Sequence, residues 1–128
     1  MTEGQAAKKI IIIDDDRASR VLMRTMLQTL DPPCEISEAI GGQQGMRMIE
    51  TGRPDLVLLD VLMPDIDGIS ICSKLKHDFS TRAIKVLMVT ARRDERMIRA
   101  GILAGADDYI TKPFTQEQFL GVIKRLLE

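Results

Sequence analysis

The chain has 128 residues, enough for one domain with a buried core and too few for two. Hydrophobic residues make up 45% and charged residues 29%, and the net charge of −1 with scattered Lys and Arg argues against direct nucleic-acid binding. No apolar stretch approaches the roughly 20 residues of a membrane-spanning helix. The first nine residues hold no apolar signal-peptide core, and Cys34 and Cys72 form no paired motif. We therefore expect a cytoplasmic protein with free thiols and no membrane contact.

The first third of the chain alternates between a β-rich run and an amphipathic segment. Residues 8–14 are a continuous β-branched run, which predicts a strand buried on both faces. Residues 19–30 carry apolar side chains at helical spacing and stop before two prolines, Pro32 and Pro33. A weaker second strand is predicted at residues 34–39.

The middle of the chain repeats this alternation. Gly41 and Gly42 open a predicted helix that ends near Gly52. Residues 55–60, DLVLLD, are apolar between two acids and predict a third buried strand. Residues 66–78 are expected to form the next helix.

The last third contains two more such units. Strands are predicted at residues 85–90 and 107–111, and helices at 94–104 and 116–127. Alternation of this kind predicts one α/β domain, a doubly wound parallel sheet sandwiched between helices. We expect that domain over residues 8–128, behind a disordered tail at residues 1–7.

Chemically reactive side chains follow four of the predicted strands. The first strand runs into Asp14, Asp15 and Asp16, and the others end at Asp60, at Thr90 and just before Lys112. Because the carboxyl ends of parallel strands share one edge of a sheet, these side chains are expected to converge.

Carboxylates that converge repel one another unless a cation lies between them. Mg²⁺ prefers oxygen ligands and uses one or two carboxylates together with water and phosphate oxygens. Asp60 could then be both a metal ligand and the nucleophile that forms an aspartyl phosphate. Thr90 and Lys112 could bind the phosphoryl oxygens.

Four segments in order give the chain a family resemblance. The segments are IIIDDD with Arg20 shortly after, LLDVLMPDIDG, VLMVTA and DDYITKPF. Together they resemble the receiver domain of the two-component response regulators over about residues 8–127. The resemblance implies a flavodoxin-like sheet of five parallel strands in the order 2-1-3-4-5, flanked by five helices. It also implies a regulator that catalyses only its own phosphorylation and dephosphorylation, not a classical enzyme.

The resemblance also implies a role for each matching residue. Asp60 would be the phosphoacceptor, and Mg²⁺, or Mn²⁺ in its place, would be bound by Asp15, by Asp60 and by the backbone carbonyl of Leu62, with Asp14 acting through water. Thr90 and Lys112 would bind the phosphoryl group. The Lys112–Pro113 bond would be cis. Tyr109 would be a switch aromatic, coupling the phosphate with Thr90 to the face made by residues 94–104, 107–111 and 116–127.

Two positions that vary in the family bear on how long the phosphoryl group survives. Leu62 offers no side-chain hydrogen bond to an attacking water, and Arg92 could lie across the phosphate. We therefore expect slow self-dephosphorylation.

Each feature has a simpler interpretation. The acidic pair could be Asp15 and Asp16, and a third aspartate could merely cap the following helix. Asp67-Gly68 alone is an ordinary turn pattern, and Tyr109 could be a plain core residue. His77, the only histidine, is expected to face solvent near a helix end, with no phosphohistidine role.

Other functional classes fit less well. An Asp-nucleophile phosphatase needs an insert that shapes a substrate pocket, and the predicted links are short. A flavin module needs a phosphate-binding loop where DDDRAS places negative charge. An inactive receiver that serves only as an interaction module remains the main alternative.

The implied partners are a sensor histidine kinase or phosphotransfer protein, and an output domain or effector protein. Phosphorylation-dependent homodimerisation through the 94–104, 107–111 and 116–127 face is a further candidate. The chain is either a free-standing receiver or part of a longer regulator.

Overall fold

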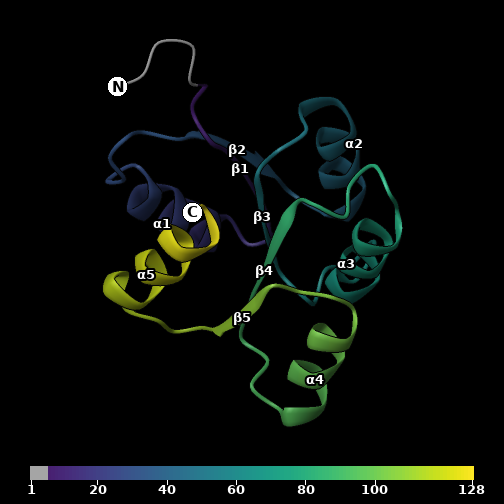
Figure 1. Cartoon of the computed structure of the whole chain (residues 1–128). Coiled ribbons are helices and arrows are strands. Elements are labelled where there is room, and N and C mark those ends of the chain that lie inside the picture. Colours follow the sequence, from purple (N-terminus) through teal and green to yellow (C-terminus); the bar gives the residue numbers. More distant parts are fainter. Residues whose placement is uncertain (1–5) are drawn as a thin grey trace.

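Five parallel strands form one sheet between two helical layers in the computed structural model, which describes residues 6–128 (Figure 1). The strand order is β2-β1-β3-β4-β5. The elements in chain order are β1 (Lys9–Ile13), α1 (Arg17–Leu27), β2 (Glu35–Ala39), α2 (Gly42–Gly52), β3 (Leu56–Leu59), α3 (Gly68–His77), β4 (Lys85–Thr90), α4 (Glu95–Leu103), β5 (Asp108–Thr111) and α5 (Gln116–Leu126). This is the doubly wound fold that the sequence predicts.

The sheet has two apolar faces because successive strand side chains point to opposite sides. In β1, Ile10 and Ile12 pack with α1 and α5, whereas Ile11 and Ile13 pack with α2 and α3. Figure 1 shows α1 and α5 on one side of the sheet and α2, α3 and α4 on the other. A strand buried on both faces must be apolar throughout, which explains the unbroken isoleucine run.

Several predicted boundaries move because capping side chains lie one residue outside the helices. Asp16 accepts the backbone N–H of Ser19, so α1 begins at Arg17 and not at Ser19. It also ends at Leu27, three residues earlier than predicted. The N–H groups of Thr29 and Leu30 instead donate to the carbonyls three residues before them, as in a turn. Asp67 caps α3, which therefore starts at Gly68. The predicted strand ends at Asp55 and Asp60 lie just outside β3.

Residues 6–8, the described residues before β1, form no helix or strand. Ala6 and Ala7 are exposed and precede β1, and the rest of the expected tail, residues 1–5, lies outside the described residues.

Both cysteines are free, and burial raises the pKa of Cys72 to about 11. No helix in the described part of the chain is long and apolar enough to span a bilayer. The Asp31–Pro32 bond is cis, which the sequence did not indicate.

Close packing of α2 on β1 holds the strand end that leads to the acidic residues. A Cβ built at Gly45 would lie 2.5 Å from Cδ1 of Ile13, the residue before Asp14. Gly121, inside α5, has open space at the same position. Packing therefore requires a glycine at position 45 and does not require one at position 121.

The same substitution at these two glycines should change stability in opposite directions. Gly45→Ala should lower the free energy of unfolding by about 1–3 kcal/mol, because the added methyl group overpacks Ile13. Gly121→Ala should raise it by about 0.5–1 kcal/mol through helix propensity. Urea denaturation of both variants measures the difference, and equal effects would show that α2 does not press on β1.

Candidate functional site

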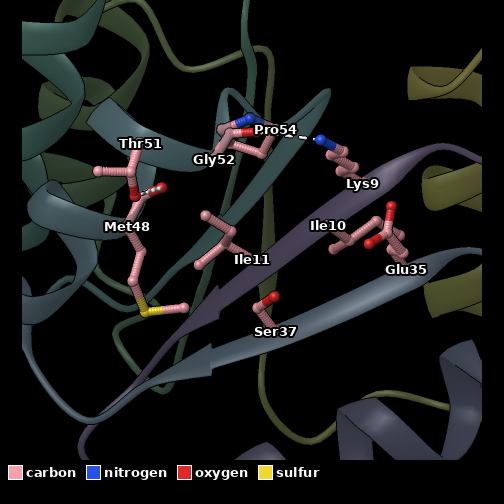
Figure 2. A pocket seen from close by; sticks show the side chains of 9 residues that line it. All are labelled: Lys9, Ile10, Ile11, Glu35, Ser37, Met48, Thr51, Gly52 and Pro54. Carbon is pink, nitrogen blue, oxygen red and sulfur yellow. Dashed lines mark hydrogen bonds between the residues drawn. The ribbon is translucent and has the colours of Figure 1, made fainter.

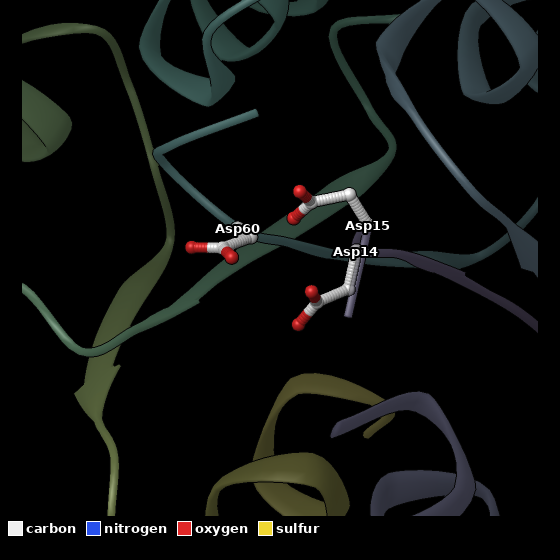
Figure 3. A group of neighbouring side chains, drawn as sticks. All are labelled: Asp14, Asp15 and Asp60. Atoms are coloured by element: carbon white, nitrogen blue, oxygen red, sulfur yellow. The ribbon is translucent and has the colours of Figure 1, made fainter. Parts of the chain in front are cut away.

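Three carboxylates meet at the carboxyl ends of β1 and β3. Ile13 pairs with Leu59 in the sheet, so the next residues, Asp14 and Asp60, leave neighbouring strands side by side. The backbone N–H of Asp60 donates to the carbonyl of Ile13 over 3.1 Å. Each of Asp14, Asp15 and Asp60 places a carboxylate oxygen within 4.8 Å of the others (Figure 3). The topology therefore gathers acids that are 46 residues apart in the chain, as predicted from the strand ends.

The three acids differ in burial. Asp14 is 1% exposed and the side chain of Asp60 is 12% exposed, whereas Asp15 is open to solvent. Burial and the Asp14 carboxylate raise the pKa of Asp60 above its ordinary value, against the opposing effects of Lys112 and Thr90. A partly buried, poorly compensated carboxylate of this kind is typical of a functional site.

Lys112 brings positive charge to the cluster from the end of β5, the strand at one edge of the sheet. It follows β5, and its Nζ donates to Oδ2 of Asp14 over 2.8 Å. The distance from Nζ to Oδ2 of Asp60 is 3.9 Å, an ion pair without a direct hydrogen bond. The Lys112–Pro113 peptide bond is cis.

Thr90 and Tyr109 both hydrogen-bond to the loop between β4 and α4. Thr90 ends β4, is 1% exposed and accepts the backbone N–H of Arg92 on its hydroxyl over 3.3 Å. The Tyr109 hydroxyl donates to the carbonyl of Arg92 over 3.0 Å. Tyr109 is half-buried and packs against Gly101 of α4, where a Cβ would lie 3.1 Å from the ring. Arg92 is thus bonded to Thr90 through its backbone N–H and to Tyr109 through its backbone carbonyl.

Leu62 and Arg92 occupy different surroundings. The Leu62 side chain is 52% exposed, and its backbone N–H helps to hold down the pKa of Asp60. Arg92 does not lie free above the cluster, because its Nε donates to Asp94, the N-cap of α4, over 3.0 Å. A position across Asp60 would require this ion pair to break.

The three consecutive aspartates have three different surroundings. Asp14 and Asp15 belong to the carboxylate cluster, and Asp16 does not. Asp16 instead accepts the N–H and the hydroxyl of Ser19 at the start of α1. The cluster geometry therefore favours the Asp14/Asp15 register over the Asp15/Asp16 alternative.

Two residues that shape the loop after Asp60 were not predicted from the sequence. A Cβ at Gly68 would lie 2.0 Å from the backbone oxygen of Asp60, so the turn requires a glycine for close approach. Asp65 accepts the N–H groups of Gly42 and Gln43 at the start of α2, which lowers its pKa. The acid-rich spacing PDIDG was the available pattern, but it does not show which backbone each acid would reach.

Two other features carry no comparable chemistry. His77 is exposed, and its Nδ1 lies 2.7 Å from the carbonyl of Ser73 on its own helix. A hollow of about 220 Å³ lies at the amino ends of β1 and β2, at the opposite end of the sheet from Asp60 (Figure 2). Its one lysine, Lys9, is bonded to the Gly52 carbonyl.

The donor set of the cluster fits a hard divalent cation. All three side chains offer carboxylate oxygens, the ligands that Mg²⁺ prefers. Burial first, and the Asp14 carboxylate second, raise the pKa of Asp60 despite the opposing effect of Lys112. A cation bound among these oxygens would relieve that repulsion.

Comparisons with known proteins agree with this geometry. The family model of the response regulator receiver domain matches residues 10–124. The DNA-binding dual master transcriptional regulator RpaA of Synechocystis is 37% identical over 119 residues, which cover 93% of this chain and 48% of RpaA. The chain thus spans about half the length of the curated relatives it matches.

Solved structures show the same likeness. A response regulator from Chloroflexus aurantiacus superposes with a TM-score of 0.88 at 30% identity, covering 95% of this chain and 98% of that one. The BeF3-activated DrrB receiver domain gives a TM-score of 0.85 at 31% identity, again covering 95% and 98%.

Burial of the ionised Asp60 and its repulsion by Asp14 should have a measurable effect on stability. Because its pKa is raised on folding, Asp60 lowers stability as pH rises above about 4, the ordinary pKa of an aspartate. Asp60→Asn should therefore raise the melting temperature at neutral pH by roughly 2–5 °C in the presence of a chelator. Mg²⁺ should stabilise the unsubstituted protein and affect Asp60→Asn much less.

Glu50→Gln, which removes an exposed carboxylate on α2, is the control and should change neither quantity. A chelator-treated Asp60→Asn protein that melts at or below the temperature of Glu50→Gln would contradict the proposed destabilisation by the ionised Asp60.

Proposed function

Since this chain belongs to the response regulator receiver domain family, we propose that it accepts a phosphoryl group on Asp60 from a phosphohistidine of a sensor histidine kinase or phosphotransfer protein. The observation that carries the proposal is the position of the Asp60 carboxylate. It lies within 4.8 Å of oxygens from Asp14 and Asp15 and 3.9 Å from the Lys112 ammonium, at the open carboxyl edge of the sheet.

The transfer is a substitution at phosphorus. One carboxylate oxygen of Asp60 forms the new P–O bond as the P–N bond to the donor imidazole breaks, and the electron pair leaves with the imidazole nitrogen. Lys112 would bind a phosphoryl oxygen, and the Thr90 hydroxyl would bind another. The raised pKa of Asp60 means that its ionised form is disfavoured at this site. A bound cation would favour the carboxylate form that attacks phosphorus.

The metal assignment follows the donors present. Asp15 and Asp60 would bind Mg²⁺ directly, the carbonyl of Leu62 would be a third protein ligand, and Asp14 would act through water. When bound, Mg²⁺ or Mn²⁺ would neutralise charge on the carboxylates and the phosphoryl oxygens. Asp14, buried and paired with Lys112, is suited to the indirect role because its Oδ2 already accepts the ammonium.

Switching would run through the loop that Thr90 and Tyr109 share. The Thr90 hydroxyl can donate its proton to a phosphoryl oxygen on Asp60 while it still accepts the Arg92 N–H on a lone pair, so a Thr90 side chain drawn toward the phosphoryl group would pull on Arg92. Movement of Arg92 would alter its carbonyl bond to Tyr109 and the packing of that ring on Gly101 of α4. The phosphoryl group would thereby shift the population of the α4-β5-α5 face.

The α4-β5-α5 face and the net charge of the chain suggest the kind of partner. We propose an output domain or effector protein that contacts α4, β5 and α5, with a phosphorylation-dependent homodimer through this face as one arrangement. RpaA is named as DNA-binding, and this chain covers 48% of its length. The net charge of −1 gives no support for direct DNA contact by this domain. The chain would act in the cytoplasm, where sensor kinases present their phosphohistidines.

A phosphatase is the less favoured candidate. The described residues 6–128 include no insert between the elements that could cover Asp60 and shape a substrate pocket. An inactive receiver would leave the complete set of Asp60, Thr90 and Lys112 without a use.

Phosphorylation can be measured as a change in intact mass. Incubation with acetyl phosphate and Mg²⁺ should add one phosphoryl group to the unsubstituted protein and to Glu50→Gln. The addition should be absent in Asp60→Asn and without Mg²⁺. Addition to Asp60→Asn at an equal rate would place the acceptor elsewhere, and no addition to any protein would favour the inactive receiver.

The lifetime of the phosphorylated form should depend on Leu62. Leu62→Asn introduces an amide that can position a water near Asp60, so the decay rate should rise roughly three- to tenfold. Phe79→Asn, at a residue that is 82% exposed on the loop before β4, is the matched control and should decay as the unsubstituted protein does. Loss of mass after acetyl phosphate is removed gives both rates, and unchanged decay in Leu62→Asn would refute this role.

A further inference from the structure

The Lys112 ammonium has a second hydrogen-bond acceptor, Ser19 on α1, besides Asp14. The distance from Lys112 Nζ to Ser19 Oγ is 3.0 Å, and the two residues are 93 positions apart in the chain. Ser19 is half-buried and has no part in the phosphoryl transfer described above. Its contact with the one lysine of the site therefore needs a separate explanation.

Asp16 determines which way the Ser19 hydroxyl can point. The hydroxyl lies 2.8 Å from Oδ2 of Asp16, a carboxylate that can only accept, so the hydroxyl proton is donated there. The Ser19 lone pairs are then left to accept from Lys112. Asp16 also donates its own backbone N–H to Oδ1 of Asp14 over 2.9 Å, which closes a ring through Asp14, Asp16, Ser19 and Lys112.

The number of donors on the ammonium gives this ring a consequence. A lysine ammonium has three N–H donors. Asp14 and Ser19 take two of them, at 2.8 and 3.0 Å. Asp60 Oδ2 is 3.9 Å away, too far for a hydrogen bond with the third donor but close enough that an oxygen carried on Asp60 could reach it.

We infer that Ser19, oriented by Asp16, is a positioning residue that holds the Lys112 ammonium ready for the phosphoryl oxygens on Asp60. A flexible lysine side chain loses rotamer freedom when it is fixed, and a donor fixed in advance avoids that loss during the reaction. The catalytic part of this inference rests on the proposed phosphotransfer to Asp60. The fixing of the ammonium does not, and it can be measured alone.

The start of α3 offers a matched control. There Asp67 accepts the backbone N–H of Ser70 on Oδ1 and its hydroxyl on Oδ2, both over 2.9 Å, whereas Asp16 accepts both groups of Ser19 on Oδ2. Within residues 6–128, no lysine hydrogen-bonds to Ser70. Ser70→Ala therefore removes the same hydroxyl-to-aspartate bond as Ser19→Ala, keeps the backbone N–H cap, and leaves Lys112 untouched.

Hydrogen exchange of the Lys112 ammonium tests the positioning without any phosphoryl donor. In ¹⁵N-lysine-labelled protein without metal, the ammonium signal that disappears in Lys112→Arg belongs to Lys112. Its exchange rate should rise roughly three- to tenfold in Ser19→Ala, return toward the original in Ser19→Thr, and stay unchanged in Ser70→Ala. Equal exchange in Ser19→Ala and Ser70→Ala would overturn the inference.

The phosphorylation rate then tests the catalytic part. With acetyl phosphate and saturating Mg²⁺, Ser19→Ala should react roughly three- to tenfold more slowly than Ser70→Ala, and Ser19→Thr should recover most of the rate. The Mg²⁺ Kd should change less than about twofold, because Ser19 contacts none of the proposed metal ligands directly. Equal rates would show that Ser19 does not assist the transfer. If the unsubstituted protein takes up no phosphoryl group, the proposed function fails, and ammonium exchange alone decides whether Ser19 holds Lys112.

Discussion

The structure depends on one electrostatic constraint, the gathering of three carboxylates at the carboxyl ends of β1 and β3. Parallel pairing of Ile13 with Leu59 makes this unavoidable, because Asp14 and Asp60 are the next residues on neighbouring strands. Lys112 pairs closely with Asp14 and only loosely with Asp60, whose pKa is raised. The fold thus holds one carboxylate with too little positive charge around it, which suits a residue that must meet both a cation and a phosphoryl donor.

The same constraint connects the site to the rest of the domain. Two segments of the site are tied to different helices: the loop after β3 to α2 through Asp65, and Lys112 to α1 through Ser19. The loop after β4 leads toward α4, bonded to Thr90 on one side and to Tyr109 on the other. A group that draws Thr90 toward Asp60 would therefore act on Arg92, and through its carbonyl on Tyr109 and α4, and so could shift the population of that face.

Sequence patterns predicted the parts of this arrangement that follow from strand topology. The isoleucine run identified a strand covered on both faces, and parallel pairing then placed Asp14, Asp60, Thr90 and Lys112 at one edge. The residues missed are those whose partners depend on loop paths. Gly68 looked like an ordinary turn residue but is required by the approach of the Asp60 backbone. Asp65 reaches across 23 residues to α2, and Arg92 pairs with Asp94, contacts that no local periodicity encodes.

The central claim is that Asp60 is the carboxylate that carries the phosphoryl group, with Lys112 as its partner. The most direct test is a crystal structure grown with Mg²⁺ and beryllofluoride, which forms a phosphoryl-like adduct on a carboxylate. We expect beryllium bonded to an Asp60 oxygen, a fluorine within hydrogen-bond distance of Lys112 Nζ and another near the Thr90 hydroxyl, and the cation among Asp14, Asp15 and Asp60. Beryllofluoride bonded to Asp15 or Asp16, or an adduct on Asp60 that leaves Lys112 on Asp14 and Ser19 alone, would contradict this claim.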